Sequence, residues 1–378
     1  MKLATKFIHA GQDPDPRTGA VNVPINTSST YKQDGVGVQR DGYEYARSGN
    51  PSRRSLEQTL AAAENGKFGR AFASGLAAET AVLSLLSPGD EVVSTPDIYG
   101  GTYRLFTKVF PKYGISFRFV ESHDPAEIAK AFTAKTRLIW IETPTNPLLN
   151  IVDIAEVAAR KPKDAILAVD NTFASPYFQT PLDLGADLTV HSTTKYIGGH
   201  SDIIGGAIVT NRADLDEPLG FYQNAAGSIQ SPYESYLVQR GLKTLAVRME
   251  QHQSNARVVA EFLRGHTAVE KVFFAGFEDH PGYAVAKKQM RGQPGMVSLR
   301  LQGGRPSVDR FIRGLSLITF AESLGGVESL ACYPYLMTHG SIPAEQKDRI
   351  GITENLVRLS IGIEDPEDLL DDLRRALG

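Results

Sequence analysis

The sequence predicts an α/β protein in which a large, mostly parallel sheet precedes a smaller α/β domain. Short apolar runs alternate with segments of helical length between residues 52 and 209. The run at residues 136–141 (TRLIWI) is nearly continuous in its apolar character, which is typical of a parallel-sheet strand buried on both faces. After residue 233, apolar residues punctuate a long charged segment at helical spacing. We expect this segment to cross from the first domain to the second.

Length and composition suit a globular protein of two domains. The chain has 378 residues, of which 42% are hydrophobic and 22% charged, so disorder is not expected. The net charge of −3 and the lack of a basic run argue against a nucleic-acid partner. One cysteine cannot form an intrachain disulfide, and no apolar run approaches the ~18 residues of a membrane span. With no signal peptide in view, we expect a cytoplasmic protein without a metal site.

The N-terminal segment is expected to be an arm that lies on something else. Residues 1–47 are rich in turn-forming residues and contain no long periodic segment. Tyrosine, arginine and glycine are concentrated at residues 43–51 (YEYARSGNP), where an anchoring loop is the structural alternative to a functional one. We therefore expect an arm over 1–47, a large domain over 48–245 and a small domain over 246–378.

Turn signals and apolar runs define the expected elements in chain order. A helix over 52–64 precedes a strand over 68–73, and the Ser-Gly turn at residue 74 opens a helix that runs to residue 86. Further strands of the large domain are expected at 91–94, 114–120, 136–141, 166–169 and 203–209. In the small domain, strands are expected at 271–274, 296–299, 317–320 and 356–360, before a closing helix over 365–377.

Polar and glycine residues follow several of these strands. In mostly parallel sheets, ligands bind at the carboxyl ends of the strands. The residues that come just after expected strands are Gly75, Tyr99, Asn146, Asp170 and Lys195. We expect them to converge on one crevice.

Asp170 and Lys195 indicate the chemistry of that crevice. A carboxylate at the end of one buried strand and a lysine after the next, with a helix-sized interval between them, is the arrangement that pyridoxal phosphate requires. The lysine amine forms a Schiff base with the aldehyde, and the aspartate keeps the pyridine nitrogen protonated so that the ring accepts electrons. The turn at Gly75, before a helix N-terminus, suits a phosphate. A helix cap at Asp170 and a tight turn at Gly75 are the structural alternatives.

Seven motifs together resemble the cystathionine γ-lyase and cystathionine γ-synthase branch of the pyridoxal-phosphate enzymes of Cys/Met metabolism. They are residues 45–51 (YARSGNP), 74–78 (SGLAA), 99–102 (YGGT), 142–147 (ETPTNP), 170–173 (DNTF), 192–196 (STTKY) and 358–364 (RLSIGIE). The resemblance covers the whole chain in the right order. It implies fold type I, the aspartate-aminotransferase-like fold, with a seven-stranded, mostly parallel sheet and a smaller C-terminal α/β domain. It also implies a homotetramer built as a dimer of dimers.

The resemblance implies a role for each residue at the cofactor. Lys195 would hold pyridoxal phosphate and then move protons between the substrate and the cofactor. Asp170 would pair with the ring nitrogen, and Tyr99 would stack on the ring and exchange protons if its pKa is lowered. The remaining cofactor-binding residues would be Gly75, Leu76, Ser192, Thr194, Asn146 and Thr172, with Tyr45 and Arg47 reaching the phosphate of the neighbouring subunit.

The resemblance also implies how a substrate amino acid is held. Asn146 and Arg358 would receive the α-carboxylate, because a guanidinium offers a bidentate fork, and the backbone near Ser323 would assist. Glu322 would receive the distal ammonium of cystathionine, and Arg104 favours the same substrate. Because β-lyases more often have an apolar side chain at the position of Glu322, the resemblance favours chemistry at the γ-carbon.

The reaction that we predict is α,γ-elimination of L-cystathionine to cysteine, 2-oxobutanoate and ammonia. The alternatives are a cystathionine γ-synthase that joins O-acetyl- or O-succinylhomoserine to cysteine, a β-lyase or bifunctional β/γ-lyase, and a non-catalytic subunit that binds pyridoxal phosphate. Methionine γ-lyases have a cysteine where this chain has Gly101. Cys332 is expected to be structural, and the aromatic segment 331–336 (ACYPYL) would influence substrate choice.

Overall fold

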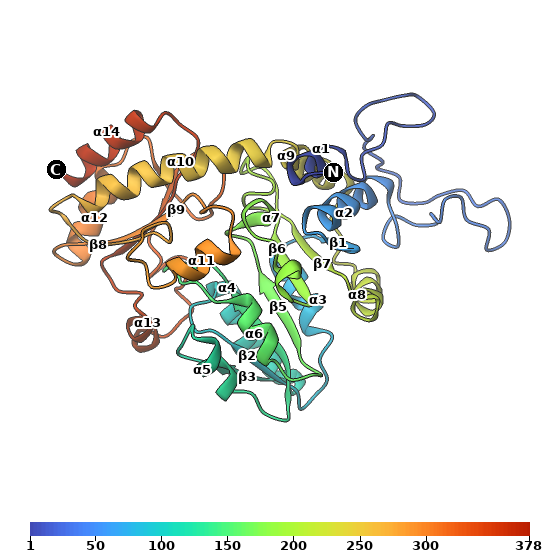
Figure 1. Ribbon diagram of the computed structural model, residues 1–378. Helices are drawn as coiled ribbons and strands as arrows, with labels where there is room; N and C mark the ends of the chain where they lie inside the picture. Colours follow the sequence, from blue (N-terminus) through green and yellow to red (C-terminus); the bar gives the residue numbers. More distant parts are fainter.

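The computed structural model describes all 378 residues and contains two β-sheets that are connected by a long helix (Figure 1). The larger sheet has seven strands in the order β1-β7-β6-β5-β4-β2-β3, and the smaller has five in the order β10-β11-β12-β9-β8. The long helix, α10 (Leu245–Arg264), runs from the large sheet to the small one. The expected fold class, a seven-stranded sheet followed by a smaller α/β part, is confirmed.

The large sheet is parallel except at one strand. Its strands are β1 (Phe68–Phe72), β2 (Glu91–Ser94), β3 (Ser116–Phe119), β4 (Thr136–Glu142), β5 (Ile166–Asp170), β6 (Leu188–Ser192) and β7 (Gly206–Thr210). Only β7 runs antiparallel to its neighbours, β1 and β6. The central strands are buried on both faces, which explains the almost continuous apolar run of β4.

Helices cover both faces of this sheet, and apolar cores lie on either side of it. The helices of this part of the chain are α2 (Pro51–Ala63), α3 (Gly75–Leu83), α4 (Gly100–Arg104), α5 (Pro125–Lys130), α6 (Ile154–Arg160), α7 (Ser175–Phe178), α8 (Ala213–Ala226) and α9 (Pro232–Leu242). Helix α2 begins where the sequence predicts, because the side chain of Asn50 accepts hydrogen bonds from the N–H groups of Ser52 and Arg53.

Two local expectations in the large sheet were wrong. The interval between Asp170 and Lys195 does not hold a full helix but only the four residues of α7 and a 3₁₀ turn at Pro181–Leu184. A proline lies in the first turn of each segment, a position that helices tolerate. Pro181 also disfavours a helical conformation at Thr180, so α7 does not continue into the 3₁₀ turn. Strand β7 begins at Gly206, so residues 203–205 form a loop that approaches the site and not the first part of a strand.

The small sheet consists of β8 (Val269–Phe273), β9 (Met296–Leu301), β10 (Thr319–Phe320), β11 (Leu330–Cys332) and β12 (Leu356–Ser360). Strand β11 was not expected, because its three residues carry too little pattern to be recognised. Also not expected were α11 (Tyr283–Gln289), α12 (Arg305–Gly314) and α13 (Ala344–Ile350), which connect the strands. The closing helix, α14 (Pro366–Leu377), is capped by the side chain of Asp365, which accepts a hydrogen bond from the N–H of Glu367.

The N-terminal segment combines one short helix with a long excursion. Helix α1 (Leu3–His9) was not expected; its Phe7 is fully buried in the core beside α2. Between this helix and α2 the chain forms no helix, and in Figure 1 it extends far from the rest of the molecule. Exposed apolar side chains lie along it, among them Val21 and Val36. The boundaries at residues 47 and 245 remain a prediction. No helix of the protein has the length and apolar character needed to cross a lipid bilayer.

Candidate active site

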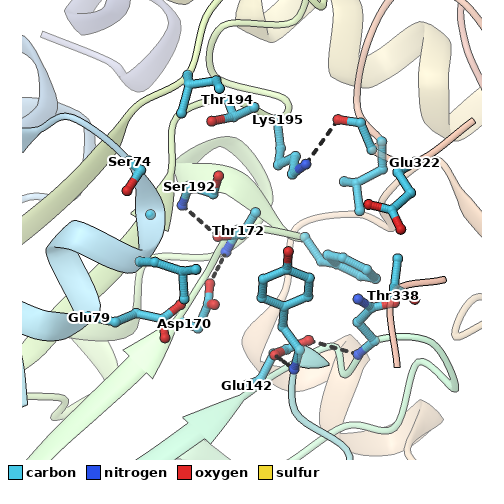
Figure 2. A pocket seen from close by; sticks show the side chains of 18 of the residues that line it. Ser74, Glu79, Glu142, Asp170, Thr172, Ser192, Thr194, Lys195, Glu322 and Thr338 are labelled. Carbon is cyan, nitrogen blue, oxygen red and sulfur yellow. Dashed lines mark hydrogen bonds between the residues drawn. The ribbon is translucent and has the colours of Figure 1, made fainter. Parts of the chain in front are cut away.

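One cavity of about 330 Å³ lies at the carboxyl ends of β4, β5 and β6, with residues of the small sheet on its other wall. It brings together most of the side chains that the sequence singled out (Figure 2). These are Gly75, Leu76, Tyr99, Asn146, Asp170, Thr172, Ser192, Thr194, Lys195, Glu322, Ser323 and Arg358. The cavity also includes Ser74, Glu79, Glu142, Phe173, Ile204, Leu324 and Thr338, which the sequence analysis did not assign to it.

Lys195 projects into the cavity from the turn after β6, and it has no carboxylate partner. Its Nζ donates a hydrogen bond to Oγ of Ser323 at 2.9 Å. Burial and the positive charge of Arg358 lower the pKa of Lys195 to about 8. Roughly one amine in ten is therefore unprotonated at pH 7, far more than for an ordinary lysine. The unprotonated amine is the form that attacks a carbonyl carbon.

Asp170 ends β5 and is 8% exposed. Its Oδ1 accepts a hydrogen bond from the N–H of Thr172 at 2.9 Å, and no basic side chain forms an ion pair with it. Burial raises the pKa of Asp170. A bound cation would supply the positive charge that no side chain provides to this carboxylate, and a protonated pyridine nitrogen is such a cation.

Glu142 lies beside Asp170 because the two residues are direct partners in the register of β4 and β5. The carboxylate of Glu142 accepts hydrogen bonds from the N–H groups of Tyr99 and Asn146, at 2.9 and 2.8 Å. Burial and the neighbouring Asp170 raise the pKa of Glu142 well above its usual range. Glu142 thus ties together two loops that carry expected site residues. The sequence signal was its place in the motif at 142–147.

The N-terminus of α3 forms the end of the cavity that suits a phosphate. Ser74 caps this helix, its side chain accepting a hydrogen bond from the N–H of Ala77 at 3.0 Å. A Cβ at Gly75 would come within 3.0 Å of the Cβ of Ser192, so a side chain there would crowd the space that the Ser192 hydroxyl borders. The hydroxyl of Thr194 lies nearby at the loop containing Gly205, from which it accepts an N–H hydrogen bond at 3.0 Å.

These features fit pyridoxal phosphate. A helix N-terminus with adjoining hydroxyl groups suits the phosphate, a buried and unpaired carboxylate suits the ring nitrogen, and a lysine with a lowered pKa suits the aldehyde. The residues involved are the ones expected from sequence, and Thr172 helps to connect them: its Oγ1 accepts a hydrogen bond from the N–H of Ser192 at 2.9 Å.

Arg358 extends from β12 to the opposite wall and is 2% exposed. Its Nη1 donates to Oδ1 of Asn146 at 2.9 Å, and its Nη2 donates to the carbonyl oxygen of Ser323 at 2.8 Å. Ser323 has a φ of 105°, a conformation that is strained for a residue with a side chain. Arg358, Asn146 and the backbone at Ser323 therefore form one cluster, as expected for a carboxylate-binding site.

Tyr99 and Glu322 border the open side of the cavity. Burial, together with the negative charges of Glu322 and Glu79, raises the pKa of Tyr99, so a lowered pKa, the condition attached to its proton exchange, is not met in the chain itself. The phenol consequently stays protonated and can donate a proton. A Cβ at Gly101 would lie 2.4 Å from the Tyr99 ring, so glycine is needed there for this ring position. Arg104 is exposed on α4 and does not line the cavity.

Tyr45 and Arg47 are exposed and lie away from the cavity of their own chain. The guanidinium of Arg47 stands 5.4 Å from the centre of the Tyr45 ring, and its Nε donates to Oδ1 of Asn224 at 3.2 Å. Within one chain, Tyr45 and Arg47 are, with Arg104, the expected site residues that the fold does not bring to the cavity.

A buried network behind the cavity supports two of its loops. Asp97 accepts hydrogen bonds from Thr145 Oγ1 at 2.5 Å and from Asn150 Nδ2 at 2.8 Å, and its Oδ1 lies 2.6 Å from Nε2 of His123. Burial opposes the charge of His123, but the adjacent Asp97 outweighs this effect and raises the pKa of the imidazole. The network links the loop that leads to Tyr99 with the loop that carries Asn146.

Cys332 is buried in β11, directly opposite Arg358 in the register of β12, and it does not line the cavity. Tyr333 packs against the core of the small sheet, where the guanidinium of Arg305 lies 4.5 Å from the centre of its ring. Of the segment 331–336, Leu336 is exposed. The segment therefore lies beside the cavity wall and is not part of it.

The chain is similar over its whole length to a known enzyme family. Residues 4–378 match the profile of the family described as Cys/Met metabolism PLP-dependent enzyme. The chain is 54% identical to cystathionine γ-synthase of Mycobacterium leprae over 99% of this chain and 96% of that protein. It is 50% identical to cystathionine γ-lyase of Dictyostelium discoideum (100% and 97% covered) and to cystathionine β-lyase of Lactococcus lactis (99% and 98% covered). The crystal structure of metB from Corynebacterium glutamicum superimposes with a TM-score of 0.97 at 49% identity, covering 100% of this chain and 98% of that one.

Proposed function

The chain belongs to the family of PLP-dependent enzymes of Cys/Met metabolism, and from that premise we propose that it acts on cystathionine at the γ-carbon. The first activity proposed is α,γ-elimination, in which L-cystathionine and water give cysteine, 2-oxobutanoate and ammonia. One observation carries this proposal: a single cavity places an unpaired lysine, a buried aspartate and a buried arginine around a glutamate at the entrance. The arginine and the glutamate would bind the two ends of a diamino acid, and the lysine would move protons on the carbons between them.

The cofactor would be held along one wall of the cavity. The N–H groups of Gly75 and Leu76, with the hydroxyls of Ser192 and Thr194, would bind its phosphate, and Asp170 would bind the ring nitrogen. When bound, pyridoxal phosphate supplies an aldehyde that takes up an amino group and a ring that accepts electrons from the carbons of the substrate. Tyr99 would lie against the ring, and Asn146 and Thr172 would complete the pocket.

Lys195 and Tyr99 would move the protons. The Nζ of Lys195, with its pKa lowered to about 8, would take the proton from Cα of the substrate and pass it on to the cofactor. As a free amine again, it would then take a second proton from Cβ. The protonated phenol of Tyr99 or the ammonium of Lys195 would then donate a proton to the departing γ-sulfur. Both groups face the same cavity, so one bound substrate would reach both.

The substrate would lie between Arg358 and Glu322. The guanidinium of Arg358, with Asn146, would bind the α-carboxylate in the buried part of the cavity. Glu322 is exposed at the opening, where its carboxylate would receive the distal ammonium of cystathionine. We propose that Arg104, on the exposed face of α4, contacts the distal carboxylate of cystathionine, because its guanidinium is positively charged.

A second activity is favoured by the comparisons. Relatives named cystathionine γ-synthase, from Mycobacterium leprae and Mycobacterium tuberculosis, share 54% and 53% of their residues with this chain, whereas the γ-lyase and β-lyase relatives share 50%. We therefore propose that the same site also joins an O-acylhomoserine to cysteine by γ-replacement, with release of the acyl group as a carboxylic acid. The two reactions differ in whether the γ-carbon loses or gains a sulfur substituent, and the same residues serve both.

The decisive experiment is a product assay on the purified protein. With cystathionine, we expect 2-oxobutanoate and not pyruvate as the main keto acid, because cleavage at the γ-carbon leaves four carbons. In parallel, O-acetyl- or O-succinylhomoserine plus cysteine should yield cystathionine. Pyruvate as the main product would refute the preference for the γ-carbon. A protein that binds the cofactor but turns over none of these substrates would be the non-catalytic subunit.

Glu322→Ala should discriminate between substrates. We expect kcat/KM for cystathionine to fall roughly tenfold, the effect of losing about 1.4 kcal/mol of binding, because the distal ammonium loses its carboxylate. An S-alkyl homocysteine, which lacks that ammonium, should be cleaved at nearly the wild-type rate by the variant. Glu322→Gln should show an intermediate loss for cystathionine. Equal losses for both substrates would contradict the role of Glu322.

The exposed arm leads us to propose that Tyr45 and Arg47 complete the site of a neighbouring subunit in a homotetramer. Arg47→Ala and Lys195→Ala should each be nearly inactive alone. Mixed dimers formed by co-expression would contain one site with both native residues, so activity should return to roughly a quarter of the wild-type value. If mixing restores nothing while the subunits do associate, each chain completes its own site.

A further inference from the structure

Glu79 is a buried carboxyl group in the cavity that the proposed chemistry does not use. It lies on α3, one helical turn after Gly75, so both residues are on the face of the helix that borders the cavity. The side chain is 4% exposed. In Figure 2 its carboxyl group lies next to that of Asp170, at the end of the cavity away from the helix N-terminus.

The hydrogen bonding of Glu79 is incomplete. Its Oε2 is buried and has no hydrogen-bond partner, and no basic side chain forms an ion pair with it. The contrast with Glu142 is informative, because the oxygens of Glu142 accept two backbone N–H hydrogen bonds. An ionised carboxylate with one oxygen that lacks a donor is costly in a buried position. A carboxylic acid that donates its own proton would be satisfied there.

The charged surroundings favour the same protonation state. Asp170 faces Glu79 from β5, and Glu142 stands beside Asp170 on β4. His191 of β6 is the basic group whose charge acts on Asp170. Tyr99 and Thr102, at the start of α4, are the remaining polar groups that face Glu79. Burial and the charge of Asp170 raise the pKa of Glu79 well above its usual range. Two adjacent buried carboxyl groups do not both ionise readily.

We propose that Glu79 is a positioning residue for Asp170: it keeps a proton and donates it in a hydrogen bond to the Asp170 carboxylate. Asp170 is then held from one side by the N–H of Thr172 and from the other by Glu79. Its negative charge would stay directed at the ring nitrogen of the cofactor. This inference rests on the proposed placement of that nitrogen against Asp170, and it is independent of which γ-carbon reaction is catalysed.

The test begins with cofactor affinity. Glu79→Gln keeps a hydrogen-bond donor, whereas Glu79→Met keeps the length of the side chain without one. Apoprotein is titrated with pyridoxal phosphate at neutral pH, and binding is followed by absorbance. We expect the dissociation constant of Glu79→Met to rise roughly 10- to 100-fold, as for loss of a hydrogen bond to a charged group, and that of Glu79→Gln to stay within about threefold. Glu261→Gln, on the exposed face of α10, is the matched control.

The outcomes separate the two claims. Wild-type affinity in a folded Glu79→Met protein would overturn the role of Glu79 while leaving the proposed function intact. Absence of cofactor binding by the wild-type protein would overturn the proposed function itself. A weakened Glu79→Gln that matches Glu79→Met would also overturn the inference, since the amide would then provide no useful donor.

The thermal stability of the apoprotein gives a second test. It requires neither the cofactor nor a folded Glu79→Met variant. A carboxyl group whose pKa is higher in the folded than in the unfolded state stabilises the folded protein most at a pH below its unfolded-state pKa of about 4.3. This stabilisation is lost as the pH rises to the folded-state pKa. Relative to Glu79→Gln, which is uncharged throughout, the wild-type melting temperature should therefore fall as pH increases from 5 to 9. Parallel melting curves for the two proteins over this range would contradict a proton retained on Glu79.

Discussion

The geometry of the site depends on the hydrogen bonds of the buried Arg358 guanidinium. This side chain leaves the small sheet at β12 and donates hydrogen bonds to Asn146, at the end of β4, and to the backbone of Ser323. A buried positive charge must be matched by acceptors, so this contact favours one relative position of the two sheets. The cavity lies between them, and each sheet supplies one of its walls. Ser323, whose carbonyl oxygen accepts one of these hydrogen bonds, has a strained backbone with a φ of 105°.

A second feature of the site is that its reactive groups are not paired with one another. Elsewhere in the chain, buried acids find basic partners, as in the contact of Glu64 with His191 and of Glu91 with Arg118. Lys195 donates to a hydroxyl group, and Asp170 accepts from Thr172, but neither forms an ion pair. Desolvation without compensation shifts both pKa values toward the neutral forms. Unpaired polar groups of this kind are costly for stability and are typical of sites that bind a charged ligand.

Much of this site follows from sequence because it is built at strand ends. Asp170 and Lys195 each follow a recognisable apolar run, and parallel topology then requires their side chains to meet at one edge. The pairing of Glu142 with Asp170 depends on strand register, which the residue pattern alone does not reveal. Glu79 was missed because a glutamate one turn into a helix is ordinarily exposed. Helix α1 and strand β11 were missed because short elements carry too little periodicity, and Phe7 shows its importance only once packed.

The central claim is that Lys195 is the residue to which pyridoxal phosphate attaches in this cavity. Treating the purified holoprotein with borohydride would convert a lysine–cofactor linkage into a stable amine, which peptide mapping by mass spectrometry can locate. We expect a pyridoxyl group on Nζ of Lys195 and on no other lysine. A reduced, cofactor-bearing peptide from any other part of the chain, or none from a protein shown to contain the cofactor, would contradict it.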